Sequence, residues 1–388
     1  MTEQRTAYLC PRIFDGAAFH SDSALIVERG RILAIVPTGD LDDTMPRRCL
    51  PEGIIAPGFV DLQVNGGGGV MLNDDQSVDA LRRIAQAHAT LGATSILPTL
   101  ITDAPEKTIT AIDAVEAAIA ADIPGIIGLH LEGPHLSVAR KGAHEARFIR
   151  SMTDADVTIL IDGARRLPVL KMTVAVENVT PAQIRQLTDA GLIISLGHTQ
   201  ASAAQVQEAV DAGASCVTHL FNAMSQLGNR EPGLVGSAIC QPGLSAGLIA
   251  DGIHAHPDSI GIALRAKAGP GKIFLVSDAM AVAGSDLTEF HLGGRKVLRR
   301  EGRLTLEDGT LAGADLDQLT AIRNLIGWGF ADPAGALAMA TSIPAAVIGY
   351  STGPGHLKPG VSADFLHIEL DGTGPATVWH RGVAVTAG

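Results

Sequence analysis

The chain has 388 residues, of which 46% are apolar and only 3% aromatic, with 44 glycines and 20 prolines. This length and composition are typical of a folded, loop-rich α/β protein with a large core, and they exclude a disordered chain. The net charge of −12 excludes a protein that binds nucleic acid or a membrane surface through general positive charge.

The cysteines and the N-terminal residues indicate the cellular location of the protein. The four cysteines, Cys10, Cys49, Cys216 and Cys240, are scattered without a Cys-x-x-Cys pair, which is typical of reduced thiols rather than a disulfide framework. The first residues carry no apolar signal segment, and no apolar run is long enough to span a bilayer. We therefore expect a cytoplasmic protein with no membrane and no nucleic acid among its partners.

Short β segments with turns mark both ends of the chain. They occupy residues 24–28, 31–36, 363–370 and 377–383. Helical periodicity is absent from about the first 55 residues, and alternating or β-branched runs bounded by turns are typical of strands. We predict one small β-sandwich domain that is built from residues 1–56 and 355–388.

The middle of the chain alternates apolar runs with amphipathic segments. The apolar runs occupy residues 59–64, 93–100, 126–131, 169–176, 192–196, 215–220, 245–250 and 273–277. Continuous runs of this length are typical of parallel strands that are buried on both faces. Most are separated by segments of helical spacing, such as 78–91, 153–166 and 202–212. The count predicts an α/β fold, a (β/α)8 barrel of the TIM type, over residues 57–354.

Two regions decide how this barrel is completed. Residues 221–244 contain several glycines and prolines, so we expect a long loop there in place of a helix. A loop of that length in a compact domain is usually functional. Helices near residues 315–328 and 333–348 are expected to close the barrel.

Metal-ligand residue types stand where predicted strands end. Glu132 follows the third apolar run, His198 the fifth and His219 the sixth. In a barrel of this type the carboxyl ends of all strands meet at one rim. A carboxylate and two imidazoles suit a divalent transition metal such as zinc, and three protein ligands leave one coordination position open for water. The sequence therefore predicts a catalytic metal centre.

Other polar residues fall at the same rim, and each has a competing structural role. Asp278 ends the eighth run and is placed to move protons, although it could instead cap the next segment. Gln63 and Asn65 follow the first run, where they could orient water and the neighbours of the metal or serve only the strand end. Glu177 ends the fourth run, and we expect it to support the site or the fold rather than bind metal.

A set of motifs runs along nearly the whole chain and resembles the N-acetylglucosamine-6-phosphate deacetylases of the amidohydrolase superfamily. The motifs are Pro57-Gly58-Phe59-Val60-Asp61, His130-Leu131-Glu132-Gly133-Pro134, Lys141-Gly142-Ala143-His144, Leu196-Gly197-His198-Thr199, His219-Leu220-Phe221-Asn222-Ala223-Met224, Arg230-Glu231-Pro232-Gly233, Asp251-Gly252-Ile253-His254, Ser277-Asp278-Ala279 and Thr310-Leu311-Ala312-Gly313. Each motif alone is a weak signal, but the ordered set is specific, and the split β domain agrees with it.

The resemblance implies a reaction and the residues that perform it. The reaction is metal-dependent hydrolysis of the acetamide of N-acetyl-D-glucosamine 6-phosphate to D-glucosamine 6-phosphate and acetate, in amino-sugar catabolism. The implied metal ligands are Glu132, His198 and His219. Asp278 would act as general base and then general acid, and His144 would share the charge that develops on the carbonyl oxygen.

The resemblance also implies one divalent metal per subunit. Many members of the superfamily carry His-x-His after the first strand and hold two metals, whereas this chain has Gln63-Val64-Asn65 at that place. Zn²⁺ is the expected ion, and Fe²⁺, Co²⁺ and Mn²⁺ are the alternatives.

A pocket for the sugar phosphate is implied around the metal. Its predicted residues are Ala143, Asn222, Ala223, Arg230, His254, Leu311, Ala312 and Gly313. Arg230 would bind the phosphate, because a guanidinium matches phosphate geometry in bidentate fashion, and an ion pair with Glu231 is its competing role. In this family a phosphate contact can come from the neighbouring subunit, so we expect a homodimer.

One stretch departs from the family pattern and leaves the substrate open. Residues 314–317 read Ala-Asp-Leu-Asp where relatives carry small hydroxyl residues, and two carboxylates near a phosphate are unfavourable unless they point away. The alternative substrates are N-acetylgalactosamine 6-phosphate and other N-acyl or cyclic amides. A barrel that serves only as a non-catalytic scaffold is a further alternative, which the presence of all three ligands and the acid/base disfavours.

Overall fold

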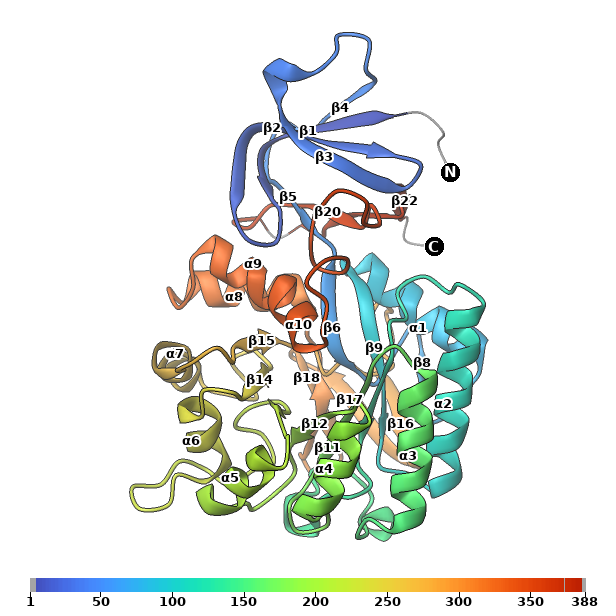
Figure 1. Cartoon of the computed structure of the whole chain (residues 1–388), viewed down its shortest axis with the longest axis vertical. Coiled ribbons are helices and arrows are strands. Elements are labelled where there is room, and N and C mark those ends of the chain that lie inside the picture. Colours follow the sequence, from blue (N-terminus) through green and yellow to red (C-terminus); the bar gives the residue numbers. More distant parts are fainter. Residues whose placement is uncertain (1–4, 373, 386–388) are drawn as a thin grey trace.

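Eight parallel strands form the centre of the molecule in the computed structural model, which describes residues 5–372 and 374–385 (Figure 1). They are β6 (Phe59–Val64), β9 (Ala93–Ile101), β10 (Leu129–Glu132), β11 (Leu170–Val174), β12 (Ile193–Leu196), β13 (Cys216–Val217), β14 (Ser245–Leu248) and β15 (Ile273–Leu275). Their order in the sheet follows the chain. Each strand overlaps one of the eight predicted apolar runs.

The barrel closes between the first strand and the residues just after the last. Asp278 donates its backbone N–H to Gln63 O at 3.1 Å, and Asn65 donates its own to Ala279 O at 2.9 Å. Val64 and Ala279 form a parallel bridge between these bonds. The closure confirms the predicted (β/α)8 barrel and brings the ends of the first and eighth strands together.

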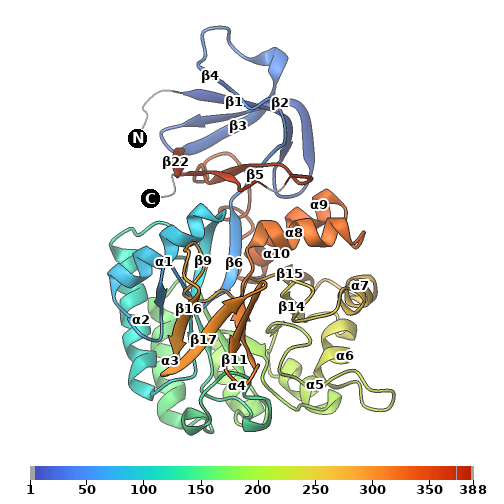
Figure 2. The same cartoon turned by 180° about the vertical axis from the view of Figure 1, so that it is seen from behind.

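Helices cover the outside of the barrel, as Figure 2 also shows from behind. They are α1 (Val78–Thr90), α2 (Pro105–Ala120), α3 (Asp154–Arg166), α4 (Pro181–Asp189), α5 (Ala203–Asp211), α6 (Gly233–Cys240), α7 (Pro257–Ala266), α8 (Gln318–Gly327), α9 (Pro333–Ala340) and α10 (Ser342–Val347). The connection after β10 contains two short 3-10 helices, η2 (Val138–Arg140) and η3 (Ala146–Phe148), and a third, η1 (Thr38–Asp40), lies in the N-terminal segment. Capping boxes start α3, α4 and α5 and fix where these helices begin. Within the described residues, none of the helices is long and apolar enough to cross a membrane.

The prediction of a loop over residues 221–244 is wrong for the second half of this segment. Helix α6 lies there, and seven of its eight residues are buried. A helix that is buried on nearly every side has no polar face, so its sequence shows no amphipathic period, and its two glycines weaken its helix propensity. The part from 221 to 232 is irregular, as expected.

An inserted antiparallel sheet, which the sequence analysis missed, lies between β15 and α8. Its strands are β16 (Glu289–Leu292), β17 (Arg295–Arg300), β18 (Arg303–Leu306) and β19 (Leu311–Ala314), paired in that order. Phe290, Leu292, Val297 and Leu304 form its buried face. Their neighbours along the strands are largely polar or charged, and only two or three apolar residues per strand reveal the pattern. In Figure 2 this sheet lies across the barrel in orange.

Strands from both chain ends build one further sheet. They are β1 (Thr6–Phe14), β2 (Phe19–Glu28), β3 (Arg31–Pro37), β4 (Arg47–Cys49), β5 (Ile54–Pro57), β20 (Phe365–Ile368), β21 (Thr377–His380) and β22 (Val383–Val385); β7 (Gly66–Gly67) and β8 (Val70–Met71) form a separate pair after β6. The rings of Phe365 and Trp379 stack at 4.7 Å, and Tyr8 meets Phe365 edge-on. This small core joins the two ends into the predicted terminal β domain, while its division from the barrel at 56/57 and 354/355 stays a prediction.

Candidate metal centre

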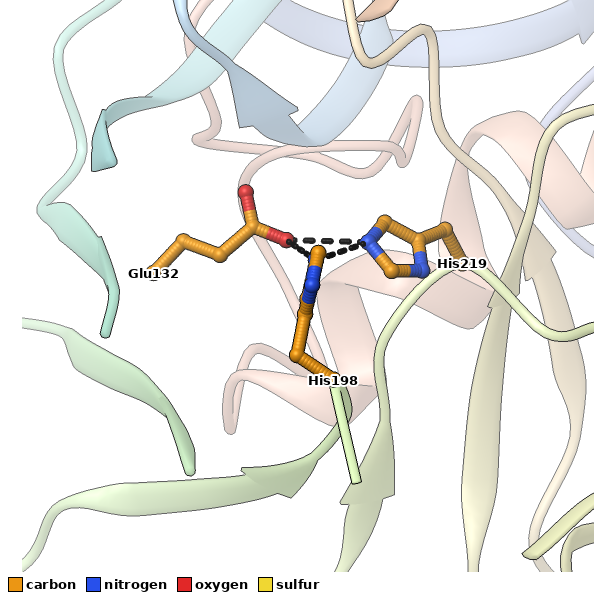
Figure 3. A group of neighbouring side chains, drawn as sticks. All are labelled: Glu132, His198 and His219. Atoms are coloured by element: carbon orange, nitrogen blue, oxygen red, sulfur yellow. Dashed lines mark hydrogen bonds and ion pairs between the residues drawn. The ribbon is translucent and has the colours of Figure 1, made fainter. Parts of the chain in front are cut away.

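Three buried side chains converge at the rim of the barrel. Glu132 is the last residue of β10, and His198 and His219 each follow a strand, β12 and β13, by two residues. Glu132 Oε1 lies 3.0 Å from His219 Nε2 and 3.3 Å from His198 Nε2, and the two nitrogens are 3.0 Å apart. Figure 3 shows the carboxylate and both rings pointing at a common centre. The structure thus brings together the three residues that were predicted as metal ligands.

The donor set and its spacing fit a tetrahedral metal ion. Ligand atoms about 2.0–2.2 Å from a tetrahedral zinc lie roughly 3.3–3.6 Å from one another, close to the three distances of this site. The three residues are only 2–4% exposed, and a buried carboxylate is costly unless a cation pairs with it. The two nitrogens also face each other with their lone pairs unless a proton or a cation lies between them. One divalent cation would satisfy all three groups.

Neighbouring groups fix the orientation of His198. Its Nδ1 donates to the backbone oxygen of Arg140 at 2.7 Å, which sets the tautomer and leaves the lone pair on Nε2 for the metal. Glu177 accepts hydrogen bonds from Thr199 Oγ1 at 2.5 Å and from Gln200 N at 2.7 Å. Glu177 therefore holds the turn that follows His198, a contact in keeping with the supporting role expected for it.

Left-handed backbone conformations gather at the site. His198, His219, Ala223 and Asp278 have φ angles of 48°, 27°, 49° and 51°. Such conformations cost about 1–3 kcal/mol each for residues other than glycine and persist only where the surrounding structure holds them. Three of these four residues, His198, His219 and Asp278, lie two or three residues after a strand of the barrel, so the sharp turn that follows the strand is what directs the side chain to the rim.

Asp278 lies beside the ligands in a small network of amides. Its Oδ1 accepts hydrogen bonds from Asn65 Nδ2 at 2.7 Å and from Gln63 Nε2 at 3.1 Å. The same nitrogen of Gln63 lies 3.2 Å from Glu132 Oε1. Burial, and next the negative charge of Glu132, raises the pKa of Asp278. The two amides therefore donate to the carboxylates of the site, and Gln63 links a metal ligand to Asp278.

His144 reaches the site from the loop after β10. Its Nδ1 lies 2.8 Å from Thr102 Oγ1, and its ring centroid lies 4.4 Å from that of His198. With Nδ1 engaged, Nε2 is the ring nitrogen left for the cavity. Burial, and next the charge of His198, lowers the pKa of His144 to about 3. His144 is therefore neutral at physiological pH and can donate a hydrogen bond from Nε2.

A cavity of about 240 Å³ opens onto these groups. The predicted site residues that line it are Asn65, Glu132, Ala143, His144, His198, His219, Asn222, Ala223, His254, Asp278, Leu311 and Gly313. Gln63 and Ala312 are fully buried behind its wall. Arg230 does not line the cavity but lies on the exposed part of the 221–232 loop. One chain therefore assembles the predicted site except for this arginine.

Some residues of the cavity wall were missed by the sequence analysis. They are Ile101, Gly142, Ile249, Met280 and Thr310. Ile101 ends β9 and Ile249 directly follows β14, so the strand-end rule that found the ligands would have found these two had apolar residues been considered. Thr310 directly precedes β19 and opens the quoted motif at 310–313, so its place beside the predicted Leu311 was the signal that could have found it.

A hydrogen bond to Asp251 orients His254 at the cavity wall. His254 Nδ1 lies 2.6 Å from Asp251 Oδ2, and Asp251 Oδ1 accepts the backbone N–H of His254 and of Ile253, both at 2.8 Å. Asp251 was not predicted as a site residue, although it opens the quoted motif at 251–254. The carboxylate fixes the tautomer of His254, so that Nε2 is left for a ligand.

Comparisons with known sequences agree with this geometry. A model of the amidohydrolase family matches residues 54–385. The chain is 43% identical over 326 residues to the N-acetylgalactosamine-6-phosphate deacetylase of Shewanella sp. (strain ANA-3), which covers 84% of this chain and 82% of the relative. It is 33% identical over 346 residues to the N-acetylglucosamine-6-phosphate deacetylase of Haemophilus influenzae, which covers 88% and 90%.

Solved structures extend the likeness to the whole chain. The crystal structure of the N-acetylglucosamine-6-phosphate deacetylase from Pasteurella multocida has a TM-score of 0.92 and 32% sequence identity to this chain. The alignment covers 98% of this chain and 99% of that one. Barrel, inserted sheet and terminal β domain therefore follow the same fold in both proteins.

Proposed function

The chain belongs to the amidohydrolase family, and on this premise we propose that it removes the acetyl group from N-acetyl-D-glucosamine 6-phosphate. The products are D-glucosamine 6-phosphate and acetate, a step of amino-sugar catabolism. The observation that carries the proposal is the convergence of Glu132, His198 and His219 within 3.3 Å of one another beside Asp278, at the rim of a closed barrel. Relatives that are named as deacetylases of N-acetylhexosamine 6-phosphates support it.

One divalent metal per subunit, with Zn²⁺ as the proposed ion, fits the donor set. Glu132, His198 and His219 would hold it. When bound, such an ion supplies Lewis acidity and brings the pKa of water from about 15.7 towards about 7. Gln63 and Asn65 donate N–H groups to the carboxylates and offer no imidazole to a second ion.

Asp278 is the proposed proton carrier. As water attacks the acetamide carbonyl carbon, Asp278 takes the proton that the water loses. When the C–N bond breaks, Asp278 passes that proton to the departing nitrogen, which leaves as the amine of the sugar, while the acetyl group leaves as acetic acid with the second proton of the water and ionises to acetate in solution. Its raised pKa suits this double role, because a carboxylate with an ordinary pKa is a poor proton donor near neutral pH.

His144 is proposed to stabilise the charge on the carbonyl oxygen. Its ring is neutral and its Nε2 is free of Thr102, which engages Nδ1. A neutral N–H donor that is already in place needs no reorganisation when the oxygen becomes negative. We expect this donor to act with the metal on the same oxygen.

The sugar phosphate is proposed to bind at the wall formed by Asn222, Ala223 and His254, with Leu311 and Gly313 beside the sugar. Among the described residues, those that line the cavity include no arginine or lysine. A dianion needs a cation, and Arg230 is exposed. We therefore propose a homodimer in which Arg230 of one subunit reaches the phosphate in the other.

Mixing two inactive variants tests this arrangement. Asp278→Asn keeps Arg230, and Arg230→Ala keeps Asp278. If the arginine acts across the interface, subunit exchange should restore about a quarter of the wild-type sites, because half of the dimers are mixed and each has one complete site. If the arginine acts within its own subunit, mixing restores nothing, and the dimeric site is refuted.

Acetate release from purified, metal-loaded protein tests the proposed reaction. The substrates to compare are N-acetylglucosamine 6-phosphate, N-acetylgalactosamine 6-phosphate and both unphosphorylated sugars. We expect the phosphorylated sugars to be preferred. Equal rates on the unphosphorylated sugars would remove the role of Arg230. No acetate from any of them, together with no bound metal, would favour the scaffold alternative.

N-acetylgalactosamine 6-phosphate is the second candidate substrate. The relative with 43% identity carries that activity in its name, which favours it on overall similarity. The two sugars differ only in the configuration at C4, so the same metal, acid and phosphate groups serve both. A ratio of kcat/KM values for the two 6-phosphates decides between them.

A cytoplasmic location is also proposed. All four cysteines are free, and Cys49 and Cys240 are exposed. Exposed free thiols are typical of a reducing compartment. Fractionation of the source cells, followed by activity measurement, tests this location.

A further inference from the structure

The inserted sheet touches the loop that carries His144. Arg295 Nη2 donates to the backbone oxygen of Ala143, and the side chain of Ala143 packs against the apolar cluster that includes the buried face of the sheet. Glu145 lies against Gly293, where a Cβ would come within 2.1 Å of Glu145 Oε1. These contacts join the β16–β17 hairpin to residues 143–145.

The hairpin presents Arg295 from a rigid position. Leu292 and Arg295 are paired across the turn, and the two residues between them, Gly293 and Gly294, have φ angles of 56° and 76°. Two glycines with positive φ suit a tight two-residue turn, which fixes the register of both strands. Leu292 is buried in the sheet's core, so the place of Arg295 is set by the sheet rather than by its own side chain.

The loop at 141–145 is also held at its two ends, where Lys141 N–H donates to Val138 O at 3.3 Å and Glu145 O accepts the N–H of Phe148 at 3.1 Å. Lys141 O accepts the backbone N–H of His144 at 3.0 Å and closes a turn in which Gly142 is exposed. Thr102 holds the ring of His144, but the peptide before that ring is held at Ala143. The bond from Arg295 therefore fixes the peptide plane from which the His144 side chain leaves the backbone.

We propose that Arg295 is a positioning residue, which holds the Ala143 carbonyl so that the 141–145 loop keeps His144 at the metal centre. The inserted sheet then forms part of the catalytic apparatus rather than a mere cover. Arg295 does not line the cavity, so it acts through Ala143 and His144. This role rests on the proposed function, because it matters for turnover only if His144 meets the reacting carbonyl.

The expected loss of kcat follows from how far His144 would be displaced. Without Arg295, the Ala143 carbonyl would lose its donor and the loop could shift. A displacement of about 1 Å at a catalytic group can lower the rate by about 10²-fold, even when the substituted residue lies away from the chemistry. Substrate affinity depends on the phosphate and the sugar, so KM should change less than kcat.

Kinetics of three variants test the proposal. In Arg295→Met, kcat on the better 6-phosphate substrate should fall by about 10–100-fold, with wild-type metal content and little change in KM. Arg295→Lys should recover most of the loss, because one N–H donor is enough for one carbonyl. Lys296→Met is the matched control, since Lys296 lies on the same strand and pairs with Glu289 at 2.7 Å; it should stay near wild-type kcat.

Three kinetic outcomes would overturn the proposal. The first is a wild-type kcat in Arg295→Met. The second is an equal loss in Lys296→Met, which would indicate a general effect of charge or sheet stability. The third is an Arg295→Lys variant as slow as Arg295→Met, which would exclude the hydrogen bond as the cause.

Amide hydrogen exchange gives a readout that does not need activity. In the metal-loaded protein, Arg295→Met should raise exchange at residues 142–145 and leave β10 and α3 unchanged. Unchanged exchange at 142–145 would refute the contact's role even in an active enzyme. If the wild type releases no acetate from any N-acetylhexosamine phosphate, the proposed function fails, while the exchange result still decides whether Arg295 orders the loop.

Discussion

At the residue scale, each chemical role has a separate physical basis. The proposed metal ligands are placed by strand ends, and the tautomer of His198 is set by the backbone carbonyl of Arg140. The proposed proton carrier, Asp278, is placed by amide donors and has its pKa raised by burial. His144 stays neutral, because burial lowers its pKa to about 3. The proposed roles therefore separate a proton carrier, Asp278, from a fixed hydrogen-bond donor, His144.

Replacing the carboxyl of Asp278 by an amide should slow the reaction without loss of the fold. Asn at 278 can still accept the hydrogen bonds of Asn65 and Gln63, but it cannot take a proton. We expect Asp278→Asn to lower kcat by at least about 10²-fold, the usual scale for loss of a general acid–base, with metal content unchanged. Asp317→Asn is the control, because Asn also caps α8 at that position. A kcat within threefold of the wild type for Asp278→Asn would contradict its assignment.

Replacing a metal-binding histidine should remove the metal and the activity together. In His219→Asn and His198→Asn, one of three donors is lost, so we expect no bound metal after gel filtration and no acetate release, while circular dichroism stays that of a folded barrel. His256→Asn is the control, since His256 is exposed and caps α7. Elemental analysis of the purified variants makes the measurement. A variant with full metal content would show that the ligands are wrongly assigned.

The residues that the sequence predicts best are those at which a costly side chain follows a buried strand. Glu132, His198 and His219 could be found because polar groups at the end of an apolar run need partners. Ile101 and Ile249 could not, because an apolar residue there is unremarkable. The exposed position of Arg230, outside the cavity of its own chain, could not be predicted either, because no sequence pattern fixes where the side chain of a loop residue lies.

At the element scale, the strand ends position the proposed site residues, and the helix caps fix where the helices around the barrel begin. Thr153 caps α3, and Asp156 accepts its N–H at 2.8 Å as well as two bonds from Arg150 at 2.5 and 2.6 Å. Residues 133–153 form the long connection between β10 and α3, and the hydrogen bonds from Arg150 Nη1 and Nη2 to Asp156 hold its end against the start of the helix. The 141–145 loop lies within this connection.

The stability given by Asp156 should depend on pH. Burial alone would raise the pKa of Asp156, but hydrogen bonds from Arg150 and Thr153 outweigh it and hold the pKa well below its usual 3.8. A lowered pKa in the folded state means that the carboxylate stabilises the protein above about pH 4 and that this contribution is lost as the pH falls further. We expect Asp156→Asn to cost about 1–3 kcal/mol at pH 7.

Urea unfolding at several pH values checks this expectation. The difference between wild type and Asp156→Asn should be largest at neutral pH and shrink below about pH 4. Asp154→Asn makes the matched control, because it removes an exposed charge from the same first turn of α3 and should cost less than about 0.5–1 kcal/mol. A difference that is constant with pH would show that the carboxylate's charge is not the source.

The elements that could be predicted from the sequence are those with a long, uninterrupted hydrophobic pattern. All eight barrel strands were found, because strands buried on both faces form continuous apolar runs. The inserted sheet was missed, since its strands are short and carry charges on one face, so that they read as polar loop. Helix α6 was missed for the opposite reason, because burial on nearly all sides removes the contrast between faces.

At the scale of the whole molecule, the metal centre joins strands that lie far apart in the chain. The three ligands come from β10, β12 and β13, and Asp278 comes from the closure of the barrel on β6. The spacing of the motifs along the sequence does not by itself predict that these residues lie together. The order of eight strands does, because a closed parallel sheet sends every carboxyl end to the same rim.

Removal of the metal should therefore weaken the whole barrel. An ion that binds only the folded state stabilises it by about 4.1 kcal/mol when its free concentration is about 1,000 times Kd. Without it, a buried carboxylate lies among imidazoles at 3.0–3.3 Å. We expect chelator-treated protein to unfold at lower urea concentration than the metal-loaded protein, and added Zn²⁺ to restore the midpoint.

The variant His219→Asn separates binding at this site from other effects of the metal. Because it lacks one ligand, its urea midpoint should not respond to chelator or to added Zn²⁺, and it should resemble the metal-free wild type. If chelation leaves the urea midpoint of the wild type unchanged, the ion does not stabilise the folded barrel. If His219→Asn responds to Zn²⁺ as strongly as the wild type, the stabilising ion binds elsewhere.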